Sequence, residues 1–558
     1  MMYLFHFFRS FLPLQNPIGF GASDFIELAF AAILVALLLA RLRLEGFAKK
    51  LAKRTRWCML FLGLLTIALR LALLPHNPVP IPSTADDTSY LLLGDTLSHL
   101  RLANPAHPFH RFFETDFVLQ EPTYSSIFPL GQGIALALGQ TIFGNPWMGV
   151  LLSEAAFCAL CYWMLLAWTE PVWALAGGLL ALFEFGPLSY WMNSYWGGAV
   201  SGIAGCLVFG ALPRICKRGR RRDAVALGLG LGAQLLTRPY EGIFLLAAVG
   251  LYFIPDWRAL VRAVPWAAVA ALPAVALTLG QNKAVTGKWT TLPYMQSRFE
   301  YGVPTTFTMQ PNPVPHRTLT QEEQLDYAAQ SQVHDREARK SFVQRAADRI
   351  RNGRFFFLPS LYLALPALLF CWRDRRILWA LAAVVLFVCG SAIYPYFHPH
   401  YIAAAACLCS LLSVIALQTL SRWRAGLFAA RLIFLLAAVH FAFWYAIHLS
   451  GNEKVLAAMP PYESWDFVNY GDPEGRIPIR GRLAQMPGKQ LVFVRFGPEH
   501  GLREWIYNRA DIDDSKVVRA LDLGPAEDEK LRGYYPDRTA WLLEPDARPP
   551  RLTPYKLK

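Results

Sequence analysis

The chain has 558 residues, of which 54% are hydrophobic and 17% are charged, and its formal net charge is +14. A soluble domain carries about a quarter charged residues, so this composition excludes an ordinary soluble protein. A strongly basic chain can bind nucleic acid, but here the basic residues lie in short loops between apolar runs. That pattern is typical of the cytoplasmic loops of a membrane protein, so we expect membrane lipids as partners and no nucleic acid.

The apolar residues form runs long enough to cross the hydrocarbon core of a bilayer. The first run is DFIELAFAAILVALLLA from Asp24, and the Phe-rich start before it lacks the cationic head and cleavage site of a signal peptide. The other candidate runs are 57–74, 126–143, 146–168, 171–187, 197–213, 224–238, 240–254, 263–280, 355–371, 377–394, 401–419 and 429–449.

Basic loops predict the topology. The most basic loops begin at Arg41, Arg214, Arg373 and Arg422, and all four are expected in the cytoplasm. Five membrane-crossing runs between the first two basic loops would place these loops on opposite sides of the membrane. We therefore interpret 126–143, which is broken by Pro129 and several glycines, as a juxtamembrane or re-entrant helix. This leaves roughly twelve spans, with both termini outside.

Three long segments are then expected on the outer side, namely 75–125, 281–354 and the tail 451–558. The tail alternates strand-like runs (KQLVFVRF, KVVRALDL, TAWLLEPD) with polar turns, which indicates a small soluble α/β domain. All nine cysteines lie in or beside apolar runs, so no disulfide framework is expected. The predicted fold is mainly α: a polytopic membrane helical bundle over 1–450 with this periplasmic domain attached.

An acidic pair, Asp86 and Asp87, follows the end of the 57–74 run in PSTADDTSY. Thr84 and Asp87 fit the signature of a helix N-cap, which gives the pair a purely structural interpretation. Other ionisable residues also gather toward the outer side, and this indicates a polar cavity there. Interfacial caps and snorkelling side chains are the alternative explanation. These residues are Arg70, Glu154, Glu184, Arg238, Glu241, His398 and His400.

The order of the motifs DDTSY, SYWMNSYWGG, GLGLGAQLLTRPYEG and YPYFHPHYIAAAACL resembles that of the GT-C superfamily of membrane glycosyltransferases, and also that of a group of bacterial proteins with this architecture. Protein O-mannosyltransferases and lipid A aminoarabinose transferases are examples of the superfamily. The resemblance covers roughly residues 57–420. The chain departs from the family pattern in having Asp87 as the second acid, Arg238 where a lysine is usual, and no basic residue in IFPLGQG.

The resemblance implies an inverting glycosyltransferase in the bacterial inner membrane, with its active site facing outward. The donor would be a polyprenyl-phosphate sugar, and the acceptor a hydroxyl of a glycan, lipid or protein. It implies Asp86 as the base, with Asp87 as the fallback or an orienting residue. The implied phosphate-binding residues are Arg70, Arg238, His400 and Tyr401, and the possible substrate-binding residues are Tyr90, Glu114, Glu241 and His398.

No cofactor is predicted. The strongest metal-ligand spacing is His398-Pro399-His400, which is a weak ligand pair. The sequence does not exclude a divalent metal ion. A secondary transporter would also have about twelve spans and buried ions, but it would need neither a long early outer loop nor a globular tail. A non-catalytic assembly protein that kept the fold is the other alternative.

Overall fold

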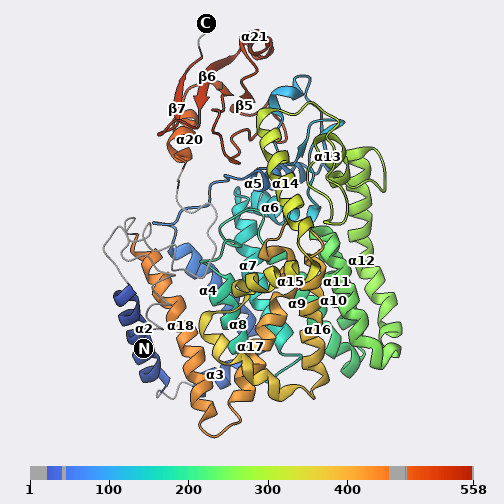
Figure 1. The fold of residues 1–558 in the computed structure, drawn as a ribbon, viewed down its shortest axis with the longest axis vertical. Coiled ribbons are helices and arrows are strands. Elements are labelled where there is room, and N and C mark those ends of the chain that lie inside the picture. Colours follow the sequence, from blue (N-terminus) through green and yellow to red (C-terminus); the bar gives the residue numbers. More distant parts are fainter. Residues whose placement is uncertain (1–21, 41–44, 452–471, 473, 556–558) are drawn as a thin grey trace.

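The computed structural model describes residues 22–40, 45–451, 472 and 474–555. The interpretation of the Phe-rich N-terminal start lies outside the described residues, as do the predicted side of the N-terminus and most of the first 20 residues of the tail. The described chain is mainly helical, with a small sheet in the tail. In Figure 1 this sheet lies at one end of the molecule, which we call the outer end following the charge-based prediction.

The helical bundle follows the apolar runs closely. Its α-helices are α2 (Ala22–Ala40), α3 (Glu45–Ala52), α4 (Thr55–Ala72), α6 (Leu130–Phe143), α7 (Trp147–Leu165), α8 (Pro171–Phe185), α9 (Ala199–Arg218), α10 (Arg221–Thr237), α11 (Pro239–Phe253), α12 (Trp257–Thr286), α16 (Arg375–Ser391), α17 (Ala406–Leu420) and α18 (Gly426–Ser450). A 3-10 turn, η2 (Ile254–Asp256), joins α11 to α12. Helices close together in sequence pack on each other, as with α9 on α10 and α10 on α12, and α2 packs on α18, which is distant in sequence.

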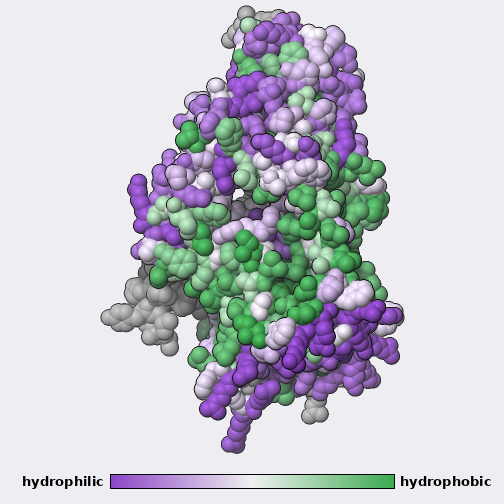
Figure 2. Space-filling view, turned by 90° about the vertical axis from the view of Figure 1, so that its right-hand side faces the viewer, coloured by the Kyte–Doolittle hydropathy of each residue, from purple (hydrophilic) through white to green (hydrophobic). Residues whose placement is uncertain are grey.

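Six helical segments of the described chain are long and apolar enough to cross a membrane. Figure 2 shows a hydrophobic band across the middle of the face in view, between two hydrophilic ends. Exposed apolar side chains of α11 and α12 such as Ile243, Leu246, Val264 and Leu272 are 49% to 63% exposed. Such side chains are stable in contact with lipid tails. The number of spans stays a prediction.

One predicted span has a different structure. The run 355–371 forms three short 3-10 helices, η3 (Asn352–Phe356), η4 (Pro359–Leu363) and η5 (Leu365–Cys371), in place of one α-helix. Pro359 and Pro366 explain this, because each removes a backbone donor and clashes with the preceding turn of an α-helix. Hydropathy alone did not predict that these two prolines interrupt the helix.

The outer segments carry secondary structure of their own. Residues 75–125 form α5 (Ala85–Ser98), η1 (His110–Phe113) and the antiparallel strands β1 (Asn104–Pro105), β2 (Val118–Leu119) and β3 (Thr123–Ser126) in the order β1-β3-β2. The second segment holds α13 (Pro293–Tyr301), α14 (Gln321–Arg339) and α15 (Phe342–Arg351). In Figure 1, α5, α13 and α14 lie between the bundle and the tail sheet.

The tail contains the three predicted strands, which form β4 (Lys489–Val494), β5 (Val517–Leu521) and β6 (Arg538–Glu544). A fourth strand, β7 (Arg551–Pro554), completes a sheet of order β5-β4-β6-β7. β4 is parallel to β5 and β6, and β7 is antiparallel to β6. Two helices, α20 (Arg476–Gln485) and α21 (Pro525–Tyr534), accompany the sheet.

The tail sheet contributes to two hydrophobic cores. One core is formed within the tail, by residues such as Leu483, Val492 and Leu543. The other is shared with the first outer segment, where Leu92 and Phe112 pack with tail residues including Phe493 and Val518. The domain boundary near residue 450 stays a prediction, and the shared core shows that the tail sheet packs against the outer segment that carries the acidic pair.

Candidate active site

The acidic pair lies in the first turn of α5. Thr84 is the N-cap of this helix, and its hydroxyl accepts the backbone N–H of Asp87 at 3.3 Å. The Asp87 carboxylate is fully buried, where it accepts the Thr84 hydroxyl at 3.0 Å and the backbone N–H of Tyr195 at 2.9 Å. Thr84 thus caps α5, as the structural interpretation of Thr84 and Asp87 predicted, and Asp87 ties the helix to the aromatic loop 186–198.

Asp86 differs from its neighbour. Its side chain is half-buried, and its carboxylate forms no hydrogen bond or ion pair with another residue of the described chain. Burial raises the pKa of this carboxyl to about 7, and the nearby Asp87 adds to the rise, while the charge of Arg238 opposes it. Asp86 is therefore available to exchange a proton near neutral pH.

Arg238 lies at the outer turn between α10 and α11. Its guanidinium stands over the ring of Tyr401, 4.5 Å from the ring centre, and forms no ion pair with a carboxylate of the described chain. Gly131 of α6 fixes the end of α10, because a Cβ there would lie 2.3 Å from Thr237 Oγ1. A close helix contact thus holds an unpaired cation near Asp86.

Two histidines lie beside this cation. His398 and His400 stack with ring centres 5.6 Å apart, and both contact the ring of Trp196 edge-on. His400 is buried, whereas His398 is exposed. The rings packed around His398 limit its hydration and lower its pKa although part of the side chain is exposed, and the positive charge of Arg238 lowers the pKa further. His398 is therefore neutral at physiological pH.

Tyr90 and Glu241 complete the group around Arg238. Tyr90 is buried and stacks on Phe128, with ring centres 4.2 Å apart. Burial raises its pKa to about 12, so the hydroxyl keeps its proton. Glu241 lies in the first turn of α11 and is buried near Arg238 without forming an ion pair with it. The structure thus brings together Asp86, Tyr90, Arg238, Glu241, His398, His400 and Tyr401.

Arg70 is bound elsewhere. It is fully buried, and it donates hydrogen bonds of 3.0 Å to the carbonyls of Asn77 and Pro78 and to the side chain of Asn193. Its guanidinium also stands over the ring of Trp147. Because these contacts occupy its donors and it has no exposed surface, they favour a structural role at the start of the outer segment over the implied phosphate contact.

Glu114 is also bound elsewhere. Its carboxylate is fully buried between Arg111 and Arg317, with N···O distances of 2.7 Å to each. Arg317 belongs to the second outer segment and also pairs with Glu121 at 3.0 Å. These ion pairs fasten the two outer segments to each other, which favours a structural role for Glu114 as well.

The outer segments contain a group of buried carboxyls that sequence reasoning missed. Burial raises the pKa of Asp326 to about 6 and that of Glu322 to about 8, and it also raises the pKa values of Asp116 and Glu504. They come from both outer segments and the tail. No local motif links these three segments, so the sequence carried no signal for the group.

The tail lies directly against the entry to α5. The backbone N–H of Glu504 donates to the carbonyl of Ser83 at 3.1 Å, and Arg476 Nη1 donates to the carbonyl of Pro82 at 3.2 Å. These contacts are three and four residues before Asp86. The tail therefore helps to fix the start of the helix that presents the acidic pair.

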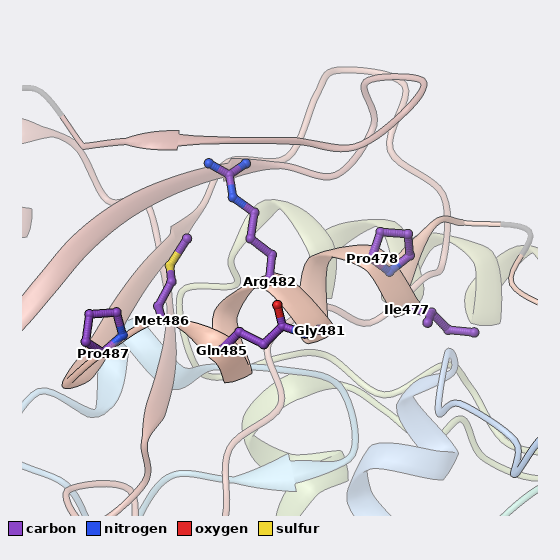
Figure 3. Close-up of a pocket in the computed structure, with 7 residues that line it drawn as sticks. All are labelled: Ile477, Pro478, Gly481, Arg482, Gln485, Met486 and Pro487. Carbon is purple, nitrogen blue, oxygen red and sulfur yellow. The ribbon is translucent and has the colours of Figure 1, made fainter.

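A pocket of about 680 Å³ lies on the tail itself, away from the group around Arg238. Figure 3 shows its lining along α20, where Arg482 extends toward the sheet. Arg482 donates to the carbonyl of Leu552 at 3.3 Å and lies 5.7 Å from the ring centre of Trp541. The lining contains no carboxylate and no histidine, so it offers no general base.

Within the described ranges, no three His, Cys, Asp or Glu side chains are arranged to hold a metal ion. No protein-family model matches the sequence, and no curated protein matches it.

The structure is similar to solved structures. One is ArnT from Cupriavidus metallidurans in the apo state, with a TM-score of 0.49 and 15% identity, over 88% of this chain and 93% of ArnT. Another is the oligosaccharyltransferase from Archaeoglobus fulgidus in complex with Zn and sulfate, with a TM-score of 0.45 and 11% identity, over 87% of this chain and 67% of that one.

Proposed function

We propose that this protein is an inverting glycosyltransferase that moves a sugar from a polyprenyl-phosphate donor to an acceptor hydroxyl at the outer face of the bacterial inner membrane. The observation that carries the proposal is the unpaired carboxyl of Asp86 near the unpaired guanidinium of Arg238. One group can take a proton and the other can bind an anion, and both reactions are needed for this transfer.

The chemistry assigns a role to each group. The acceptor oxygen attacks the anomeric carbon on the face opposite the phosphate, so one displacement inverts that carbon. The bond between the anomeric carbon and the phosphate oxygen breaks, and its electron pair stays on the phosphate. Asp86 takes the proton of the acceptor hydroxyl, while Arg238 stabilises the charge that develops on the phosphate.

The remaining residues of the group support the donor. Tyr401 lies under the Arg238 guanidinium and restricts its position. Tyr90, with its hydroxyl protonated, and the neutral His398 offer hydrogen bonds near the phosphate without adding charge. Glu241 lies near Arg238 and suits a contact to a sugar hydroxyl. The acceptor is a hydroxyl of a glycan, a lipid or a protein.

The test uses full-length protein in membranes, supplied with radiolabelled polyprenyl-phosphate sugars and analysed for label in lipid, glycan and protein fractions. Wild-type membranes should transfer label, and Asp86→Asn membranes should not. Binding of decaprenyl phosphate to the purified protein, measured by native mass spectrometry, should survive Asp86→Asn and be lost in Arg238→Gln. Undiminished transfer by Asp86→Asn would contradict the proposal, and so would a lipid phosphate that binds equally to Arg238→Gln.

A further inference from the structure

The face of α20 that meets the first outer segment carries two arginines. Arg476 and Arg480 are four residues apart in this helix, so their side chains leave from the same face. Arg476 donates to the carbonyl of Pro82 at 3.2 Å, which places this face beside the entry to α5. Arg480 is exposed and forms no hydrogen bond or ion pair within the described chain. Its charge is therefore available to a ligand.

A third arginine near this face comes from the sheet. Arg519 of β5 is partly buried, and its Nη1 donates to the backbone carbonyl of Tyr507 at 3.3 Å. It forms no ion pair in the part of the chain that the structure describes. Burial and the nearby positive charges of Arg480 and Arg476 lower the pKa of Arg519 to about 10, so it keeps its charge at neutral pH. Guanidinium groups this close repel one another, and a bound anion would relieve the repulsion.

Two tyrosines connect these arginines to the acidic pair. Tyr507 and Tyr195 pack in one hydrophobic cluster, and the charge of Arg480 acts on both hydroxyls. The Tyr507 hydroxyl forms no hydrogen bond within the described residues. Limited hydration raises the pKa of Tyr507 to about 12, so this hydroxyl keeps a proton to donate. The backbone N–H of Tyr195 donates to Asp87, so Tyr195 joins the region around Arg480 to the start of α5.

Two carboxylates near this region are bound to other groups. Asp95 pairs with Arg509 at 3.1 Å, and Glu474 pairs with Arg476 at 2.6 Å. Neither forms an ion pair with Arg480 or Arg519, so two positive charges stay uncompensated within the described chain.

We propose that Arg480, Arg519 and Tyr507 form an acceptor subsite that binds a phosphate monoester on a glycan. This inference rests on the proposed function and names the class of its acceptor. Two unpaired guanidinium groups match the charge of nearly −2 that such a phosphate carries at neutral pH, and each offers several donors to its oxygens. The subsite belongs to the tail, which lies beyond the bundle in Figure 1. We therefore assign it to a water-soluble part of the acceptor and not to the lipid phosphate of the donor.

The experiment measures binding of glucose 6-phosphate, a soluble sugar phosphate, to the full-length protein in detergent by calorimetry, with glucose as the neutral control. Wild type should bind glucose 6-phosphate and not glucose. Arg480→Gln removes a charge-assisted contact, so its Kd should rise at least about tenfold. Tyr507→Phe lacks one neutral donor and should raise the Kd about fivefold. Arg551→Gln removes an equal charge from β7, at the opposite edge of the sheet from β5, and should leave the Kd within about twofold.

A second probe separates this subsite from the donor site. Arg480→Gln should bind decaprenyl phosphate as wild type does, whereas Arg238→Gln should lose decaprenyl phosphate and still bind glucose 6-phosphate. Equal glucose 6-phosphate Kd values for wild type and Arg480→Gln would overturn the inference, and so would loss of decaprenyl phosphate in Arg480→Gln. Thermal unfolding in detergent checks that each variant is folded. If Asp86→Asn stops sugar transfer while glucose 6-phosphate binds every variant equally, this inference fails and the proposed function stands.

Discussion

Two polar regions meet at the N-terminus of α5, and they differ in how their charged groups are satisfied. In the first, which we call the clamp, Arg70, Asp87 and Asn193 are buried. Arg70 donates a hydrogen bond to Asn193, Asn193 donates to the carbonyl of Ser189, and Asp87 accepts the backbone N–H of Tyr195. In the second, which we call the open site, Asp86 and Arg238 are half-buried and form no ion pair within the described chain.

The difference shows how adjacent residues divide structure and chemistry. A buried charge without a partner is costly, so the clamp satisfies each of its charges and gains rigidity. The open site leaves its charges unpaired where a ligand can reach them. Asp86 and Asp87 are neighbours in sequence, but they fall on opposite sides of this division.

The largest effect should separate the two aspartates. We expect Asp86→Asn to lower turnover by about two to four orders of magnitude, the usual share of general-base catalysis, with little change in melting temperature. Asp87→Asn leaves the Thr84 hydroxyl or the Tyr195 N–H without its acceptor and should destabilise the protein by about 1–3 kcal/mol. Transfer rates and thermal unfolding of both variants test this. A stable Asp86→Asn protein that transfers sugar at the wild-type rate would contradict the division of roles between the two aspartates.

The two arginines give the second comparison. Arg238→Gln removes the cation of the open site, so turnover should fall about 10²- to 10³-fold while the protein stays folded. Arg70→Gln removes three buried hydrogen bonds of the clamp and should cost about 3 kcal/mol of unfolding free energy. Denaturation curves and measurements of decaprenyl phosphate binding would distinguish the two variants. A destabilised Arg238→Gln protein with normal binding would count against the open site.

The pH dependence sharpens the assignment of the base. The pKa of Asp86 is raised to about 7, and a general base acts in its deprotonated form. Turnover should therefore rise about tenfold per pH unit below pH 6 and level off above pH 7. A rate profile from pH 5 to 9 tests this. A flat profile across that range, with chemistry shown to be rate-limiting, would exclude Asp86 as the base.

The smallest effect concerns the buried carboxyls of the outer segments. The folded-state pKa of Glu322 is raised to about 8 by burial and by the nearby Glu323 and Asp326. The stability that this group contributes is complete below its unfolded pKa and is lost as the pH rises toward 8. Glu322→Gln should be close to wild type in stability at pH 5 and more stable than wild type at pH 8.5. Melting temperatures at the two pH values measure this, and an equal change at both would refute it.

Much of the architecture could be predicted from the sequence. The apolar runs placed nearly every helix of the bundle, because a long hydrophobic stretch satisfies its backbone as a helix in lipid. The run 355–371 was the exception, since Pro359 and Pro366 divide it into 3-10 turns. The strands of the tail were found because alternation and turn residues are local signals.

The candidate site could be predicted only as a set of residue types. The sequence by itself predicted that Asp86 lies in an outer loop and that Arg238 and the two histidines lie at outer hairpins, because hydropathy and loop charge indicate where each apolar run ends. Only the tertiary structure decided that Asp86 is unpaired while Asp87 is clamped, and that Tyr190 meets His400. These contacts join residues more than 100 positions apart. Helix packing, and no local pattern, brings such residues together.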